Sequence, residues 1–219
     1  MTPTAMKIDF VSDVACPWCA VGLNALERAL ERIGPDLAVE LHFQPFELNP
    51  TLSVEGADAT AYLKAKYGLD DAQLAQNRAV IRERGAAVGF AFGERTWVWN
   101  TFDAHRLLYW AGVDGPAGSQ RALKHALLQA YHGEGRNPGA EDVLLDLAAQ
   151  VGLDVDAARR ILRSESFAAE VRAAEEAWHR AGIHAVPAVI VDDQHLISGG
   201  QPPEVFERAL REIAAQRAG

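Results

Sequence analysis

Two cysteines, Cys16 and Cys19, are the residues of this chain whose type and spacing most clearly suggest chemistry. Pro17 and Trp18 separate them, and proline is favoured in the first turn of a helix, so a helix is expected to begin here. Residues at this spacing on a helix lie about 5–6 Å apart, within the Cα range that a disulfide requires. The pair therefore indicates a dithiol that can be oxidised to a disulfide.

The two cysteines are expected to differ in role. A helix N-terminus carries unpaired N–H groups and a partial positive charge, and both favour a thiolate. Cys16 lies at this junction, so we expect it to have a lowered pKa and to act as the nucleophile. Cys19 lies deeper in the first turn and is expected to attack a mixed disulfide and release the substrate.

Other interpretations of the cysteine pair have less support. Structural zinc requires four ligands, and the sequence has no second cysteine pair, so no metal site is expected. Two buried structural thiols would not need the proline or the tight spacing. A static disulfide that closes so short a loop would stabilise the fold little.

The elements around the pair form a β-α-β unit. Residues 6–11 and 39–46 alternate apolar and polar side chains and predict strands. Between them, apolar residues recur at helical spacing from Pro17 to Ile33, and Gly34-Pro35 ends the helix. A unit of this kind joins two parallel strands through a right-handed crossover.

The middle of the chain predicts helices almost throughout, and the end returns to strands. Residues 187–191 and 195–198 predict two strands, and residues 202–217 a final amphipathic helix. The expected fold class is α/β, with a large all-helical insertion in a discontinuous domain of residues 1–56 and 182–219. The insertion covers residues 57–181, with helices predicted over 60–67, 71–88, 101–112, 120–131, 140–151, 155–164 (capped by Asp154) and 166–181, and an aromatic loop over 89–101.

Composition excludes several classes of protein. The chain has 219 residues, 49% hydrophobic and 23% charged, as in ordinary globular proteins. Its formal net charge of -9 and its lack of a basic block argue against nucleic acid or an anionic membrane as a partner. Lys7 and Asp9 interrupt the early apolar segment, so we expect no secretory signal and a cytoplasmic location.

Three sequence blocks in the same order resemble the DsbA branch of the thioredoxin superfamily, and within it the FrnE-like proteins. They are SDVACPWCAVG, NTFDAHRL and AVPAVIVDDQHLISGGQP. The resemblance extends from Lys7 to about Leu210. It implies a thioredoxin-like fold and a thiol-disulfide oxidoreductase that acts on protein or small-molecule thiols, with glutathione as a possible co-substrate and no other cofactor. A homodimer is also possible.

The resemblance also implies roles for individual residues. Pro187 matches the cis-proline of the family, which leaves the backbone of Val186 free to pair with an extended substrate. Pro17 and Trp18 are expected to tune the redox couple, giving a potential between about -270 and -120 mV. Trp18 is expected to be partly exposed and is also a candidate substrate contact.

Three further residues remain open between a functional and a structural role. Asp13 could tune the dithiol or relay protons to Cys19, although a solvated turn aspartate is the favoured interpretation. Asn100 or Thr101 is a candidate helix cap, and Asn100 is also a candidate substrate contact. His105 is a candidate substrate contact, although a histidine on a helix is more often simply hydrogen-bonded within the fold. The aromatic residues of the loop could line a groove or anchor the loop: Phe90, Phe92, Trp97 and Trp99.

Two alternative functions share this fold. Glutathione-dependent isomerases of the 2-hydroxychromene-2-carboxylate type, and kappa-class glutathione transferases, usually carry a serine near the Cys16 position and need no second thiol. Retention of both cysteines favours dithiol redox chemistry. A non-catalytic peptide-binding or chaperone module is the lesser alternative, because a reactive thiol without a use invites oxidative damage.

Overall fold

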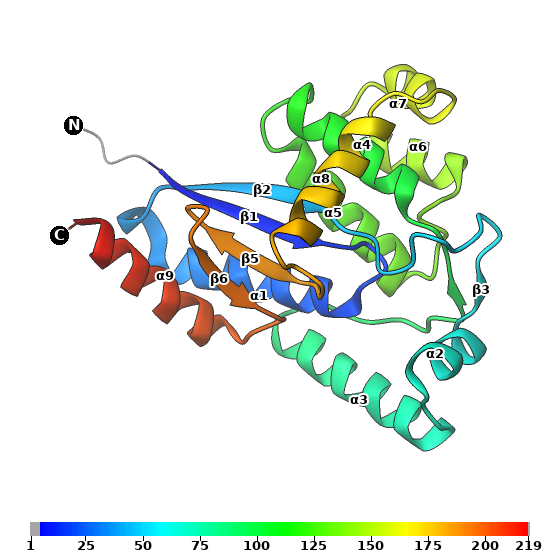
Figure 1. Cartoon of the computed structure of the whole chain (residues 1–219), viewed down its shortest axis with the longest axis horizontal. Coiled ribbons are helices and arrows are strands. Elements are labelled where there is room, and N and C mark those ends of the chain that lie inside the picture. Colours follow the sequence, from blue (N-terminus) through cyan, green and yellow to red (C-terminus); the bar gives the residue numbers. More distant parts are fainter. Residues whose placement is uncertain (1–4, 219) are drawn as a thin grey trace.

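The computed structural model describes residues 5–218, and its centre is a four-stranded sheet with the strand order β2-β1-β5-β6 (Figure 1). β1 (Met6–Ser12) and β2 (Val39–Pro45) are parallel, and Phe10 lies opposite Phe43 in their register. β5 (Ala188–Val191) runs antiparallel to β1, and β6 (His195–Ser198) runs antiparallel to β5. The expected α/β class is confirmed.

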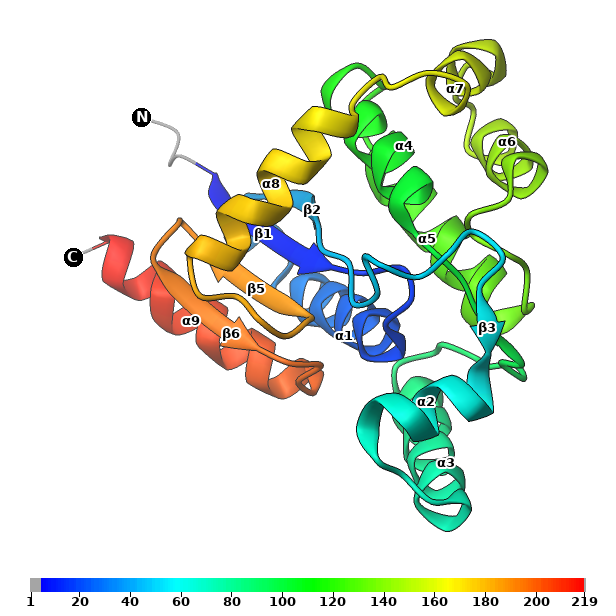
Figure 2. The ribbon, with the colours of Figure 1, turned by 45° about the vertical axis from the view of Figure 1, so that its right-hand side comes forward.

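Helices cover both faces of this sheet. The residues of β5 are apolar throughout because both of its faces are covered. Val189 and Val191 pack into the core beneath α1 (Pro17–Ile33) and α9 (Pro203–Ala218). Ala188 and Ile190 point to the opposite face, where they pack with Trp178 of α8 (Ala168–Arg180). All four residues of β5 are buried, as expected for a strand covered on both sides. Figure 2 shows α8 crossing one face while α1 and α9 lie on the other.

The crossover helix α1 has the predicted bounds, because both of its ends are marked in the sequence. Pro17 occupies the first turn, and the helix ends at Gly34, whose φ of 64° favours glycine. One face is buried against the sheet and α9, including Leu23 and Leu26. The helix therefore holds its N-terminus, where the cysteines lie, at a fixed position at the end of β1.

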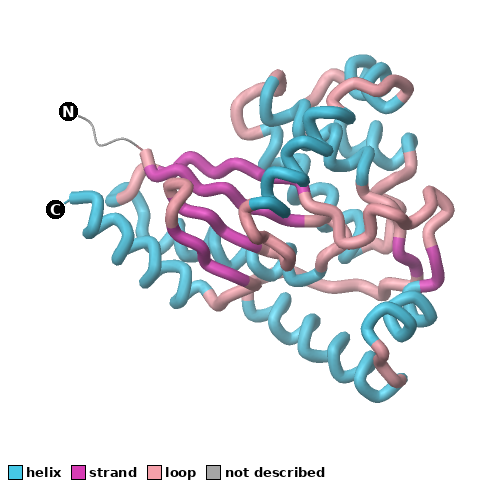
Figure 3. The backbone as a smooth tube through the Cα atoms, viewed as in Figure 1, coloured by secondary structure: helices cyan, strands magenta, loops and turns pink. Residues whose placement is uncertain are grey.

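Residues between β2 and β5 form a helical insertion with a core of its own. That core is built largely from side chains of α4 (Phe102–Val113), α5 (Ser119–Leu128), α6 (Glu141–Gln150) and α7 (Val155–Leu162). Val14 and Ala15, which directly precede Cys16, pack into the same core. The insertion is thus in direct contact with the loop that presents the dithiol. α2 (Ala59–Tyr67) and α3 (Asp71–Ala87) form a separate helical pair beside the end of α1 (Figures 1 and 3).

Two details of the insertion differ from the sequence-based expectation. It is not all-helical, because β3 (Ala57–Asp58) pairs with β4 (Trp97–Val98) inside the predicted aromatic loop. Strands of two residues are too short to leave an alternating pattern. The helix predicted to Tyr131 ends at Leu128 and continues as a π-helix over Gln129–Gly133. The predicted cap is confirmed, since the side chain of Asp154 accepts hydrogen bonds at the start of α7.

Within residues 5–218, no helix combines the length and the apolar character needed to cross a membrane. The division of the chain into a discontinuous sheet domain and an inserted helical subdomain stays an interpretation of this element order.

Candidate active site

The two cysteines lie at the start of α1, as the sequence predicts. Cys16 is the N-cap residue and has an extended backbone conformation, with φ of -88° and ψ of 114°. The amide of Cys19 donates to the carbonyl of Cys16 over 3.1 Å. Both side chains are free thiols; Cys16 is 4% exposed and Cys19 is fully buried. Cys16 is thus the more accessible thiol, in keeping with a nucleophile in front of a resolving thiol.

Pro187 lies against this helix, and the peptide bond between Val186 and Pro187 is cis, as the resemblance implies. The thiol of Cys16 donates a long hydrogen bond to the carbonyl of Val186, over 3.5 Å. Gly22 allows this close approach, because a Cβ added there would lie 2.9 Å from Cγ of Pro187. The half-buried Val186 therefore presents its backbone beside Cys16.

The two thiols have opposite pKa shifts. The hydrogen bond from Cys19 lowers the pKa of Cys16, which outweighs the effect of burial. Burial raises the pKa of Cys19 well above its ordinary value, and the hydrogen bond with Cys16 and the charge of Cys16 add to this. Cys16 is therefore the thiol of the pair that loses its proton more readily, and Cys19 is the one that keeps it.

Asp13 is not a solvated turn residue, so the favoured sequence interpretation is wrong. Its side chain is fully buried. Oδ1 accepts hydrogen bonds from the Ala15 amide and the Thr101 hydroxyl, over 3.0 and 2.8 Å, and lies 3.3 Å from Nε2 of His105. Oδ2 accepts from the Leu48 amide over 2.7 Å. The carboxylate thus joins the loop before Cys16 to the segment that follows β2 and to the start of α4.

These contacts keep the buried Asp13 ionised. Burial is the largest single effect and raises the pKa of its carboxyl, whereas the hydrogen bond and the charge of His105 lower it. The amides of Ala15 and Leu48 lower it further, so the pKa lies below its ordinary value.

The other predicted site residues occupy different kinds of position. Trp18 is partly exposed, as expected, and packs at the margin of the core that holds both cysteines. His105 is 1% exposed, so the structure places it behind Asp13 and not at a surface where a substrate would lie. Asn100 lies just before Thr101, the N-cap residue of α4, and its Oδ1 accepts from the amide of Phe102 over 2.8 Å. Its Nδ2 donates to the carbonyl of Leu52, so both ends of the amide serve the fold.

The aromatic loop is mainly anchored in the fold. Phe90 is buried, and its ring centroid lies 4.7 Å from that of Phe92. Trp99 packs edge-on against Tyr131. Trp97 is the exception, since it is 37% exposed while its Nε1 donates to the carbonyl of Glu55.

Two buried residues near the dithiol were missed from the sequence. Lys124 of α5 is 1% exposed, and its charge acts on Cys19, Asp13 and Cys16; burial lowers its pKa. His132 lies 2.8 Å from the carbonyl of Val14, and burial lowers its pKa to about 3, so it is neutral near pH 7 and donates. A signal for Lys124 was present, because it falls within the apolar stripe that contains Leu123 and Leu127.

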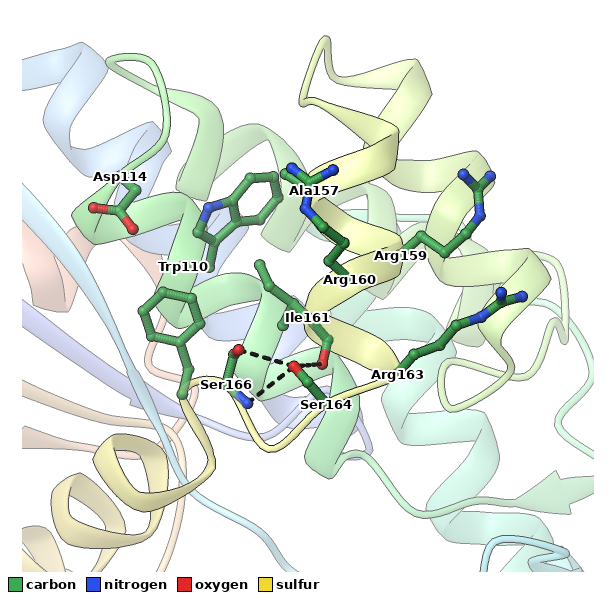
Figure 4. Close-up of a pocket in the computed structure, with 10 residues that line it drawn as sticks. Trp110, Asp114, Ala157, Arg159, Arg160, Ile161, Arg163, Ser164 and Ser166 are labelled. Carbon is green, nitrogen blue, oxygen red and sulfur yellow. Dashed lines mark hydrogen bonds between the residues drawn. The ribbon is translucent and has the colours of Figure 1, made fainter.

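A concavity lies away from the cysteines, on the helical insertion (Figure 4). It has a volume of about 710 Å³, and it is lined by residues of α4, α7 and the segment that follows α7, including Trp110, Arg160 and Phe167. Neither cysteine lines it, so it is not the site of dithiol chemistry. Within the described residues, no cluster of three or more His, Cys, Asp or Glu side chains is arranged to hold a metal ion.

A family model matches the sequence of this chain, and several solved structures share its fold. The model of the DSBA-like thioredoxin domain matches residues 7–211. The probable DsbA oxidoreductase SCO1869 from Streptomyces coelicolor is 33% identical, with 94% of this chain and 89% of that chain covered and a TM-score of 0.87. A 2-hydroxychromene-2-carboxylate isomerase is 16% identical, with 97% and 98% covered and a TM-score of 0.72. The cytosolic disulfide reductase DsbM from Pseudomonas aeruginosa, solved with GSH, is 19% identical, with 95% and 99% covered and a TM-score of 0.63.

Proposed function

The chain belongs to the DSBA-like thioredoxin-domain family, a family of thiol-disulfide oxidoreductases, and we propose that it catalyses dithiol–disulfide exchange through Cys16 and Cys19. One observation carries this proposal above all. The sulfur of Cys16 lies 3.5 Å from the carbonyl of Val186, at the N-terminus of a helix and beside a second thiol. A nucleophile, a resolving group and the backbone of the half-buried Val186 are thus in one place.

In the proposed reaction, the Cys16 thiolate attacks one sulfur of a substrate disulfide. A mixed disulfide forms and the other substrate sulfur leaves as a thiolate. Cys19 then loses its proton and attacks Cys16, which releases the second substrate thiolate and forms the Cys16–Cys19 disulfide. The substrate gains two electrons and the enzyme loses two; the reverse sequence oxidises a dithiol.

The remaining site residues have supporting roles in this proposal. The backbone of Val186 pairs with an extended substrate segment, and Pro187 fixes the direction of that backbone. Trp18 forms an apolar rim beside the reacting sulfur. Asp13 acts as a positioning residue, since it holds the loop before Cys16 through the Ala15 amide.

A glutathione-dependent isomerase or transferase is the second candidate. It is supported by the fold shared with the 2-hydroxychromene-2-carboxylate isomerase and with DsbM, which was solved with GSH. In this chemistry, a single thiolate suffices. Glutathione also fits the first proposal as a co-substrate that reduces the Cys16–Cys19 disulfide. The name of DsbM supports a cytosolic location for this chain as well.

Substitution of single cysteines separates the two candidates. In the proposed oxidoreductase, Cys16→Ser abolishes mixed-disulfide formation, whereas Cys19→Ser forms the mixed disulfide but does not resolve it. Turnover of insulin reduction is lost in both variants, and mass spectrometry detects the trapped adduct only with Cys19→Ser. A Cys19→Ser variant that keeps full glutathione-dependent turnover would instead support the isomerase. Peptide binding that persists in both variants, without turnover in the unmodified protein, would support the chaperone module.

A further inference from the structure

Three cations near the dithiol form no ion pair with a carboxylate of residues 5–218. Most arginines of the chain form ion pairs; examples are Arg32, Arg121, Arg136, Arg163, Arg172, Arg180 and Arg211. In contrast, Lys66, Arg84 and Arg95 bond to backbone carbonyls, and within residues 5–218 none of them has a carboxylate oxygen within 4.0 Å. Arg28 and Arg78 likewise bond to uncharged oxygens, so Lys66, Arg84 and Arg95 differ from them by their position near the dithiol.

Each of the three cations is fixed to a backbone segment that surrounds the dithiol. Arg95 donates to the carbonyl of Ala15, the residue before Cys16, over 3.1 Å. Lys66 donates over 2.7 Å to the carbonyl of Leu48, whose amide bonds Asp13.

Arg84 is fixed to the third segment. It donates over 3.4 Å to the carbonyl of Gly200. Gly200 packs so closely against Trp18 that an added Cβ would lie 3.0 Å from the Trp18 carbonyl. We name Lys66, Arg84 and Arg95 the cationic rim.

Tyr67 connects this rim to the reacting thiol. It is 54% exposed, although it is a large aromatic residue at the end of α2. Its ring centroid lies 5.6 Å from Nζ of Lys66. Burial raises the pKa of its hydroxyl, the charge of Cys16 raises it further, and the charge of Arg95 lowers it. Figure 2 shows α2 and α3, which carry Lys66, Tyr67 and Arg84, beside the end of α1 at which the dithiol lies.

We propose that the cationic rim and Tyr67 select low-molecular-weight thiols and disulfides that carry a carboxylate close to the reacting sulfur. This inference rests on the proposed dithiol exchange and adds the charge of its substrate. A guanidinium has five N–H donors, so one bond to a backbone carbonyl leaves others to bind a carboxylate. The three positive charges of the rim also oppose the repulsion that a chain with a net charge of -9 exerts on an anion.

The exchange itself needs no additional reactant. The Cys16 thiolate attacks one sulfur of the anionic disulfide, the other half leaves as a thiolate, and Cys19 displaces the bound half. The two electrons of the dithiol reduce the substrate disulfide to two thiols. Each of these products keeps the negative charge of its own carboxylate. The rim therefore acts on binding and approach, and not on the electron balance.

A matched pair of disulfide reagents tests the inference. 5,5′-Dithiobis(2-nitrobenzoate) carries a carboxylate on each ring, whereas 4,4′-dithiodipyridine is neutral near pH 7. Stopped-flow measurement gives the second-order rate constant of the reduced protein with each reagent. For the variants Lys66→Gln, Arg84→Gln and Arg95→Gln, we expect the rate constant with the anionic reagent to fall about threefold each and about tenfold or more in combination. The rate with the neutral reagent is expected to change by less than about twofold, because the dithiol is intact.

Arg82→Gln is the matched control, since it removes the same charge from an exposed position of the same helix, α3. We expect it to leave both rates unchanged, and we expect added salt to slow only the anionic reagent. Equal changes with both reagents, or an equal effect of Arg82→Gln, would overturn the inference while dithiol exchange stands. An unmodified protein that reacts with neither reagent would overturn the proposed function and this inference together.

Discussion

The carboxylate of Asp13 accepts a hydrogen bond from the hydroxyl of Thr101 over 2.8 Å, although 88 positions separate the two residues. Asp13 lies in the loop before the dithiol, and Thr101 lies at the start of α4 in the insertion. The same carboxylate accepts the amide of Leu48, which follows β2. The position of Cys16 therefore depends on the insertion as well as on the sheet.

Asp13→Asn is expected to destabilise the protein by about 3–5 kcal/mol, the usual effect of removing one partner of a buried ion pair. An amide cannot accept every hydrogen bond that the carboxylate accepts. Urea unfolding followed by circular dichroism measures the loss. Asp192→Asn is a comparison at a less buried aspartate that bonds the Lys7 amide, and a smaller effect is expected there. An Asp13→Asn protein within about 1 kcal/mol of the unmodified one would contradict this account of the loop.

The pH dependence of that stability follows from the lowered pKa of Asp13. A carboxyl with a lower pKa in the folded state binds its proton less readily there than in the unfolded state. Its stabilisation is therefore fully present above the unfolded pKa of about 3.9 and is lost as the pH falls through the folded pKa. The difference in unfolding free energy between the unmodified protein and Asp13→Asn should shrink on acidification below about pH 4.

The pH profile of Cys16 alkylation tests the hydrogen bond between the two thiols. Iodoacetamide should modify Cys16 of the reduced protein with a midpoint below the ordinary thiol pKa of about 8.5. Cys19→Ala removes the donor, so the midpoint should rise, whereas Cys19→Ser keeps a donor and should shift it less. Peptide mapping by mass spectrometry identifies the modified residue. A midpoint that is the same in all three proteins would show that Cys19 does not stabilise the Cys16 thiolate.

Gly22→Ala should disturb the backbone beside Cys16. The added methyl group would meet Cγ of Pro187 at 2.9 Å and Cα of Gly200 at 3.3 Å, and neither atom belongs to a flexible side chain. Overpacking of this kind costs about 1–3 kcal/mol, which exceeds the gain of up to about 1 kcal/mol in helix propensity. Thermal unfolding should show the net loss, and insulin reduction should slow because Val186 moves with Pro187. Full stability together with full activity would contradict the close packing.

Lys124→Met should slow the second half of the reaction. The charge of Lys124 lowers the pKa of Cys19, so its removal should raise that pKa further. Each unit makes the Cys19 thiolate tenfold rarer but more nucleophilic, so resolution should slow by roughly threefold per unit. Acid-quenched single turnovers measure the lifetime of the mixed disulfide. Lys64→Met, at a more exposed lysine, is the comparison, and no change in the lifetime is expected there. An unchanged lifetime in Lys124→Met would exclude an effect of Lys124 on Cys19.

The sequence predicts the local features of the site well, because local signals mark them. Pro17 and Gly34 mark the ends of α1, and the spacing of Cys16 and Cys19 indicates the dithiol. The cis bond before Pro187 comes from the family resemblance and not from local physics, since most X-Pro bonds are trans.

The features that the sequence does not predict depend on distant parts of the chain. Burial of Asp13 requires Thr101 and His105, which approach it only in the folded insertion. The charge of the cationic rim is visible in the sequence, but its lack of carboxylate partners is a property of the tertiary structure. β3 and β4 are short and are specified by their pairing with each other.

The redox equilibrium of the Cys16–Cys19 pair tests the central claim most directly. The protein is equilibrated with glutathione buffers of graded ratio, quenched with acid, and treated with a thiol reagent that adds mass to each free thiol. We predict one reversible two-electron transition, with a potential between about -270 and -120 mV, in which both thiols disappear together. A protein that keeps two free thiols at every ratio, or that forms only a stable adduct at Cys16, would contradict dithiol exchange.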